Sequence, residues 1–444
     1  MHTTGLRIGI ISTRLAGTDG VSLESAKWTT VLQELGHTVY YFAGESDRPP
    51  ELTRVVPEAH FQHAAIERIN QDLFDGTTRR APETSDMVNE LRHRLKIALR
   101  AFIRDYDLQL LKVENALSLP MNVPLGLALT EVIAETGTPT IAHHHDFAWE
   151  RSRFRVNGAE DYLHAAVPPP MTNICHVVIN SYAASELARR TGLRSTMIPN
   201  VMDFDNPPPE PNEHTYTLRD ELGLTKDDVL LLQPTRVVPR KCIERSLELA
   251  QKLERPAAVV VTHESGDEGD GYLRYLEAHA KTLGVRLILA ADRILHDRAP
   301  ARDEGTYSLA DAYYNADLVT YPSRVEGFGN AFLEAVYYRR PIMVSGYEIF
   351  KEDIEPKGFQ VVQMGEFMTQ QTIGQAELVI RNRSIASDMC EKNYLLGRIH
   401  YSHSVLRSRI EMLTEQYRQR IGLNAEWSGP MGTSGIYQAR TKGR

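Results

Sequence analysis

DLVTYPSRVEGFGNAFLEAVYYRRP, residues 317–341, carries the strongest structural signal in the chain. Its apolar start is typical of a buried strand, a glycine-containing turn follows, and the end indicates a short helix stopped by Pro341. Open α/β sheets bind ligands at such a place, because glycine lets the backbone come close and a helix N-terminus presents free N–H groups. Glu326 and Glu334 flank the turn. Two acids so placed suit a ligand with an anionic middle and hydroxyls at both ends, and a nucleotide-sugar fits that description.

Strand-like and helix-like segments alternate on both sides of this segment. Residues 6–12, 22–35 and 38–43 form a strand–helix–strand opening, which predicts a parallel sheet, and the alternation resumes after residue 229. A proline-rich run at 199–211 separates the halves and indicates a linker. The sequence therefore predicts an α/β protein with two doubly wound, Rossmann-like domains. The expected divisions are a first domain at 1–205, a second at 206–403, a helix at 404–424 that crosses back to the first domain, and a tail at 425–444.

Length, charge and cysteine content exclude several classes of protein. A chain of 444 residues exceeds the usual length of one domain, and its net charge of −8 argues against nucleic acid as a partner. The three cysteines are far apart and match no metal or disulfide pattern. We see neither a signal peptide nor an apolar run long enough to span a bilayer. These features favour a cytoplasmic enzyme; monomer and homodimer both stay open.

A basic loop follows the first strand of the predicted second domain. Arg236 and Lys241 lie within QPTRVVPRK, residues 233–241. Arginine binds phosphate in bidentate fashion and lysine acts as a point charge, so both could hold a diphosphate at the sheet edge. The alternative is a solvated basic loop.

Three further motifs belong to the first domain. The Gly17–Gly20 loop, which includes Asp19, completes neither a G-x-G-x-x-G nor a phosphate-loop motif, so it indicates a turn that contacts a donor phosphate or an acceptor. Glu114-Asn115 ends a strand and is either an acceptor contact or a helix cap. His143-His144-His145-Asp146 follows another strand. Adjacent residues of an extended segment point in alternate directions, so the three histidines do not share one metal easily. We expect one histidine and Asp146 to face the cleft.

The run Arg151-x-Arg153-x-Arg155 would place three guanidinium groups on one face if it were extended. Such a face could hold an acceptor phosphate or carboxylate. A solvated charged edge is the competing interpretation, and it is the more common fate of such residues.

These residues resemble the retaining nucleotide-sugar glycosyltransferases of the GT-B fold, specifically glycosyltransferase family four. Glu326 and Glu334 match the E-x7-E motif of that family, and Arg236 and Lys241 match its paired basic residues. Residues 198–203, IPNVMD, resemble its interdomain I-P-N-G-V-D segment. Two departures occur: Val201 replaces a usual glycine, and Cys242 follows Lys241 where glycine is usual.

The resemblance implies a role for each matching residue. Catalysis would involve Glu326, His144, Arg236 and Lys241, with His144 favoured among the three histidines. The donor would contact Gly20, Gly327, Phe328, Gly329, Asn330 and Glu334. The acceptor side is expected at Asp19, Asp146, Arg151 and Arg153. The family implies two domains that face a central cleft, no metal and no cofactor beyond the nucleotide-sugar donor.

The predicted reaction is transfer of a hexose, with retention, from a UDP- or GDP-linked sugar to a hydroxyl of a small soluble acceptor. A sugar, a sugar acid or a phosphorylated derivative would qualify. Two alternatives stay open, a nucleotide-sugar epimerase of the same fold and a non-catalytic sugar-nucleotide-binding protein. A basic helix at 87–104 raises the further alternative of a lipid acceptor at a membrane surface; a packed helix with a solvated basic face is the interpretation we prefer.

Overall fold

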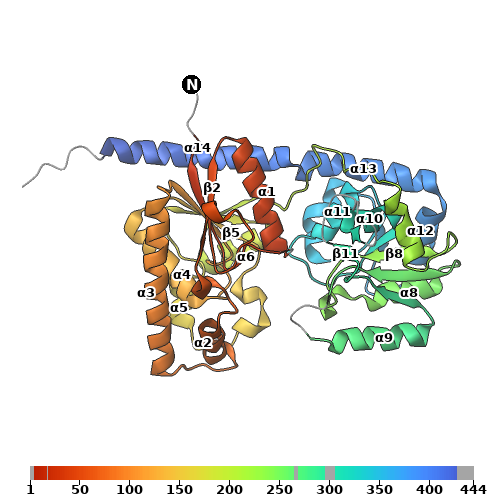
Figure 1. The fold of residues 1–444 in the computed structure, drawn as a ribbon, viewed down its shortest axis with the longest axis horizontal. Coiled ribbons are helices and arrows are strands. Elements are labelled where there is room, and N and C mark those ends of the chain that lie inside the picture. Colours follow the sequence, from red (N-terminus) through yellow and green to blue (C-terminus); the bar gives the residue numbers. More distant parts are fainter. Residues whose placement is uncertain (1–4, 18, 265–268, 296–305, 428–444) are drawn as a thin grey trace, which may run out of the picture.

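The computed structural model describes residues 5–17, 19–264, 269–295 and 306–427, with side chains described as far as Tyr417. The chain forms two lobes that lie side by side, and two consecutive helices, α13 (Arg383–Tyr401) and α14 (His403–Trp427), run along the top, α13 over the second lobe and α14 over the first (Figure 1). Each lobe is a parallel sheet covered by helices, so the predicted α/β architecture is confirmed. The predicted tail lies almost entirely outside the described residues.

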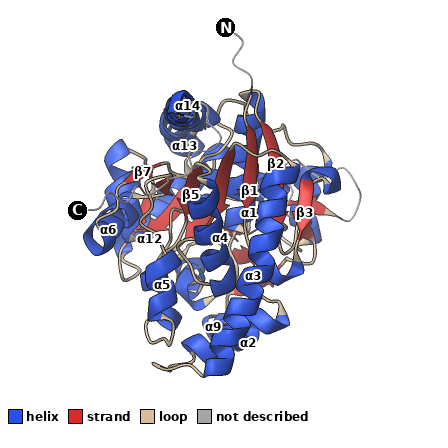
Figure 2. Ribbon diagram, turned by 90° about the vertical axis from the view of Figure 1, so that its left-hand side faces the viewer, coloured by secondary structure: helices blue, strands red, loops and turns tan. Residues whose placement is uncertain are grey.

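The first lobe is a seven-stranded parallel sheet in the order β3-β2-β1-β4-β5-β6-β7. Helices cover both of its faces (Figure 2). The strands are β1 Arg7–Ile11, β2 Thr38–Ala43, β3 Thr53–Val55, β4 Leu110–Glu114, β5 Thr140–His144, β6 Ile174–Val178 and β7 Ser195–Met197. The helices are α1 Gly20–Glu34, α2 Ala64–Phe74, α3 Pro82–Asp105, α4 Val123–Thr136, α5 Glu160–Ala166 and α6 Ser181–Thr191.

The second lobe is a six-stranded parallel sheet in the order β10-β9-β8-β13-β14-β15, with a short pair β11-β12 beside it. The strands are β8 Val229–Gln233, β9 Ala257–Val261, β10 Arg286–Leu289, β11 Ile294–Leu295, β12 Tyr307–Ser308, β13 Leu318–Tyr321, β14 Ile342–Ser345 and β15 Val362–Met364. The helices are α7 Leu218–Glu221, α8 Glu244–Lys252, α9 Gly271–Leu283, α10 Leu309–Asn315, α11 Asn330–Tyr337, α12 Gln370–Arg381 and α13 Arg383–Tyr401.

The last helix, α14 (His403–Trp427), leaves the second lobe and packs on the first (Figure 1). Its apolar side chains join the core beneath α1, and the Tyr417 hydroxyl donates to the carbonyl of Thr140 at 2.9 Å. A helix that buries such a face contributes a wall of the first lobe, so that lobe is built from residues on both sides of the second lobe in the sequence. The apolar residues are Leu406, Ile410, Leu413 and Tyr417.

The segment between the lobes is anchored to α1. Lys27 donates to the carbonyl of Val201 and pairs with Glu24 at 2.8 Å, while the Val201 N–H donates to Glu24 at 3.3 Å. Val201, which departs from the family's glycine, is fully buried in the first core. A buried valine with both backbone groups satisfied fixes the point from which the second lobe departs.

Helix α3 carries the basic residues that raised the lipid alternative. Arg92 and Lys96 bond Glu131 of α4, each at 2.6 Å, and Arg100 pairs with Glu135. The apolar face of α3 is buried against the first lobe. These charges thus already have protein partners, and that agrees with the packed-helix interpretation. No helix in the described parts of the chain is both long and apolar enough to cross a bilayer.

Candidate functional site

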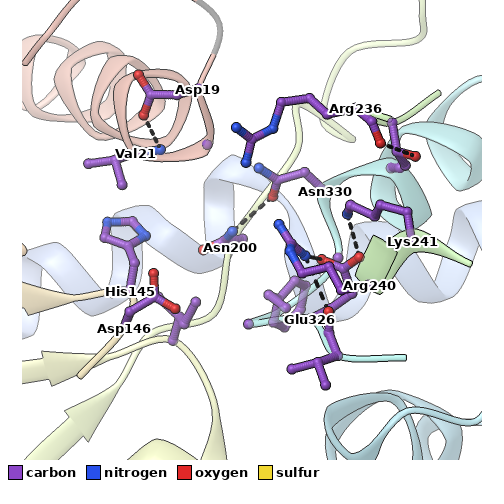
Figure 3. Close-up of a pocket in the computed structure, with 18 of the residues that line it drawn as sticks. Asp19, Val21, His145, Asp146, Asn200, Arg236, Arg240, Lys241, Glu326 and Asn330 are labelled. Atoms are coloured by element: carbon purple, nitrogen blue, oxygen red, sulfur yellow. Dashed lines mark hydrogen bonds and ion pairs between the residues drawn. The ribbon is translucent and has the colours of Figure 1, made fainter. Parts of the chain in front are cut away.

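A cavity of about 1120 Å³ lies between the lobes, where the carboxyl ends of both sets of strands face each other. Figure 3 shows side chains reaching into it from the two sides: Asp19, His145 and Asp146 from the first lobe, and Arg236, Lys241 and Glu326 from the second. Most of the residues predicted from sequence therefore share one site.

Glu326 is the centre of a buried ionic cluster. It pairs with Lys241, and it lies 3.3 Å from Arg240; the side chains of Glu326 and Lys241 are each only 9% exposed. Burial raises the pKa of Glu326, but Lys241 and Arg240 lower it by more, and the net pKa lies below its usual value. Burial likewise lowers the pKa of Lys241, an effect that Glu326 opposes. The cluster keeps a carboxylate and two cations fixed at the end of β13.

Arg236 extends into the cavity from the loop after β8 (Figure 3). Among the described residues it has no ion-pair partner, whereas Arg240 and Lys241 share Glu326. An exposed guanidinium that the protein does not neutralise is suited to bind an anionic ligand. Arg240 was missed from the sequence, although it lies in the same quoted loop, directly before Lys241.

The glycine turn has steric reasons for its composition. Gly329 adopts φ 119°, and a Cβ there would lie 2.5 Å from the hydroxyl of Tyr347, so only glycine fits without strain. The carbonyl of Gly327 accepts from Asn180 of the first lobe at 2.6 Å. Phe328 is buried and packs against Tyr401. The turn therefore offers its backbone to the cavity, since the Phe328 ring belongs to the core.

Two residues of α11 complete this wall. Glu334 is buried, lines the cavity and accepts from the Tyr313 hydroxyl at 3.0 Å. Asn330 accepts a hydrogen bond of 2.8 Å from Asn200 of the interlobe segment. The two acids of the motif thus line a single cavity from the strand end and from the helix.

On the opposite wall, α1 begins at the cavity. Asp19 caps this helix by accepting from the N–H groups of Val21 and Ser22 at 3.0 and 3.1 Å, and it lies 3.3 Å from Arg14. Gly20 faces Asn330 across the gap, since a Cβ there would lie 3.5 Å from the amide nitrogen of Asn330. Asp19 is therefore committed to helix capping, and Arg14 is an additional cavity residue that the sequence did not reveal.

The histidine run corrects one prediction. His145, and not His144, lines the cavity. His144 ends β5 with its ring pointed the other way, where its Nε2 lies 2.9 Å from Nδ1 of His176, and burial lowers its pKa well below the usual value. Because side chains alternate along a strand, His143 and His145 share one side and His144 takes the other.

Behind His145 lies a buried polar cluster. Glu114 contacts Lys112, and its Oε2 lies 2.9 Å from His143 Nδ1 and 3.0 Å from His145 Nε2. Ligand atoms of Glu114, His143 and His145 lie within 4.8 Å of one another, which a metal ion could share. The Lys112 side-chain nitrogen, however, contacts Glu114 and lies 3.2 Å from His143 Nδ1, so an amine already occupies the space among these atoms. We assign no metal to them.

The segment after β5 differs from the predicted extended run. Short 3₁₀ turns at Ala148–Glu150 and Ser152–Phe154 replace it, so the three arginines do not form one face. Arg151 lines the cavity and pairs with Asp146 at 2.7 Å. Arg153 packs on the ring of Phe154 and lies outside the cavity, so its predicted acceptor contact is wrong. Arg155 lines the cavity instead.

The two facing parallel sheets, with acids and fixed cations in the cavity between them, define a GT-B glycosyltransferase. Comparison with known proteins agrees. Mannosylglucosylglycerate synthase of Thermotoga maritima is 32% identical over an alignment of 435 positions that covers 89% of this chain and 97% of that enzyme. The enzyme of the same name from Petrotoga mobilis is 31% identical over an alignment of 383 positions that covers 81% of this chain and 87% of that enzyme. The chain belongs to the GT-B nucleotide-sugar glycosyltransferases, in the family of these synthases.

Solved structures share the fold at low sequence identity. HepE of Anabaena, crystallised with UDP-glucose, aligns with a TM-score of 0.63 and 12% identity, covering 93% of this chain and 100% of HepE. A search against family models gives no match.

Proposed function

We propose that this enzyme transfers a hexose, with retention and without a metal, from a UDP- or GDP-linked sugar to a hydroxyl of a small acceptor that carries a carboxylate. The observation that supports it most is the group of Arg236, Arg240 and Lys241 beside Glu326 in the interlobe cavity. The names of the two relatives suggest mannose as the hexose and glucosylglycerate as the acceptor.

The donor half of the site has the parts that the reaction needs. The leaving diphosphate gains negative charge as the glycosidic bond breaks, and fixed cations that need no reorganisation stabilise that charge. Arg236, which has no ion-pair partner among the described residues, is our candidate for the principal diphosphate contact. Glu326 would hydrogen-bond the hexose and Glu334 the ribose. Attack by the acceptor on the same face as the leaving group would retain the anomeric configuration.

The acceptor half is suited to a small anionic molecule. Arg14, Arg151 and Arg155 line the first-lobe wall of the cavity, and carboxylates pair readily with guanidinium groups. Residues of both lobes surround the cavity, and a closed cleft excludes the water that would otherwise hydrolyse the donor.

The test is a panel of GDP- and UDP-linked mannose and glucose, each incubated with glucosylglycerate or with its neutral analogue glucosylglycerol. We expect product only with one donor and with glucosylglycerate, an α-linkage by proton NMR if the donor is α-linked, and full activity in excess EDTA. Conversion of the donor without acceptor-linked product would identify the epimerase. Nucleotide binding without turnover of any pair would identify the non-catalytic protein.

A further inference from the structure

Glu114 and Asn115, at the carboxyl end of β4, hold His145 at two points. The Asn115 side-chain oxygen accepts from the His145 N–H at 2.7 Å, and Glu114 Oε2 lies 3.0 Å from Nε2 of the ring. Glu114 is fully buried, and the His145 side chain is 8% exposed. Strand pairing supports this geometry, because Glu114 lies opposite His143 in the β4–β5 register. Strand β5 ends at His144, so His145 follows directly at the same edge of the sheet.

The hydrogen bond determines which ring nitrogen carries the proton. A carboxylate paired with a lysine only accepts, so the bond to Glu114 requires the proton on Nε2 of His145. Nδ1 then carries a lone pair. Within the described part of the chain, Nδ1 has no hydrogen-bond partner, and His145 lines the cavity.

The free nitrogen belongs to the region where the hexose would bind. A Cβ on Gly327, the residue after Glu326, would lie 3.5 Å from the carbonyl oxygen of His145, so the two walls meet here. Burial, Lys112 and Lys27 lower the pKa of His145 to about 3, which keeps the ring neutral at physiological pH. A neutral ring with Nδ1 bare accepts a hydrogen bond and is too weak a base to remove a proton from a hydroxyl.

We propose that Glu114 is a positioning residue that holds His145 with its proton on Nε2, so that Nδ1 accepts a hydrogen bond from a hydroxyl of the transferred hexose. The hexose part of this inference rests on the proposed function; the tautomer does not. On its other side Glu114 contacts the amine of Lys112, a partner that a carboxylate buried beside the ring requires.

The first experiment reads the tautomer in the unmodified enzyme. Protein labelled with ¹⁵N-histidine is studied by long-range proton–nitrogen NMR, and the His145 signals are assigned by their loss in His145→Gln. We expect protonated Nε2 and unprotonated Nδ1 at pH 7. A proton on Nδ1, or an equal mixture of tautomers, overturns the proposal. This result needs no substrate, so it stands even if the proposed transfer reaction fails.

The second experiment compares two double variants that remove the buried charges equally. Lys112→Met/Glu114→Gln keeps an oxygen that accepts from Nε2, and Lys112→Met/Glu114→Leu does not. We expect the Gln variant to keep the Nε2–H tautomer and most of kcat. The Leu variant should show mixed tautomers and a kcat about two- to tenfold lower, the weight of one hydrogen bond between neutral groups. Equal kcat and equal tautomers in the two variants contradict the proposal. Should the Leu variant fail to fold, the NMR result on the wild-type enzyme decides.

Discussion

At the scale of single residues, substitution of Arg236 tests the proposed diphosphate contact of the donor site directly. We expect Arg236→Ala to weaken binding of the nucleoside diphosphate by about 10- to 100-fold, since a hydrogen bond to a charged group contributes about 1.5–3 kcal/mol. The melting temperature of the free enzyme should stay the same, because Arg236 is exposed and lacks an ion-pair partner among the described residues. Calorimetric titration measures both enzymes. Arg274→Ala on α9 is the matched control; equal weakening there would contradict a diphosphate role.

The buried histidines predict a loss of stability in acid. Burial lowers the pKa of His145 to about 3 and of His176 to about 4, from 6.5. Below pH 6.5 the unfolded chain binds protons that the folded protein does not. The free energy of unfolding therefore decreases as the pH is lowered. Each group contributes about 1.4 kcal/mol per pH unit until pH reaches its folded pKa.

Urea denaturation between pH 7 and pH 4.5 measures that slope. We expect His176→Gln to reduce it, and His164→Gln, on an exposed position of α5, to leave it unchanged. An unchanged slope in His176→Gln would refute the assignment of a titrating role to His176.

The sequence was sufficient to locate those site residues that directly follow a strand. Glu326 and Arg236 each follow a strand, so they had to meet at one sheet edge. The choice between His144 and His145 was different, because it depends on which face of β5 borders the cleft. That face is set by packing of the whole lobe, where His144 meets His176 and His145 meets Glu114. Arg153 failed for a related reason: two 3₁₀ turns anchored by buried Phe154 replaced the extended run.

At the scale of elements, the turn before α11 depends on Gly329. We expect Gly329→Ala to cost about 1–3 kcal/mol of unfolding free energy, because alanine is strained at φ 119° and its Cβ would meet the Tyr347 hydroxyl. Tyr347→Phe removes that oxygen, so Gly329→Ala should cost less in this background. A double-mutant cycle by urea denaturation gives the difference. Equal costs in the two backgrounds would show that the contact is absent.

The sequence was least informative about the short helices and strands. Strands β3 and β15 and helix α5 are short, and edge strands of three residues such as Thr53–Val55 are only partly buried and lack a periodic signal. The long segments were predictable because their apolar spacing is repeated over several turns, as in α3.

At the scale of the whole molecule, hydrogen bonds between described residues link the first lobe and the interlobe segment to the second lobe beside the cavity. Asn180 donates to Gly327 at 2.6 Å, Asn200 to Asn330 at 2.8 Å, and the Ser181 N–H to Asp353 at 2.8 Å. The two asparagine bonds depend on side chains, so substitution removes them; Asn180 also caps α6 by accepting from the Ala183 N–H at 2.7 Å.

We expect Asn180→Ala/Asn200→Ala to open the free enzyme. Each bond contributes about 1 kcal/mol, so the closed arrangement should lose roughly fivefold in population per bond. Small-angle X-ray scattering should show a larger radius of gyration in the double variant, and saturating donor should reverse the increase. An unchanged radius would mean that other contacts hold the lobes closed.

Helix α14 gives the first lobe a property that neither sheet has alone. Part of that lobe's core, at Leu406, Ile410, Leu413 and Tyr417, is synthesised only after every strand of the second lobe. Domains usually fold as they emerge, N-terminal first. Here the later-made lobe can complete its core earlier, and the first lobe waits with Trp28 and its neighbours uncovered until residues near 417 have left the exit tunnel. Synthesis that stops before α14 would therefore release a chain whose second lobe is folded. Its first lobe would expose to chaperones and proteases the apolar surface that α14 covers.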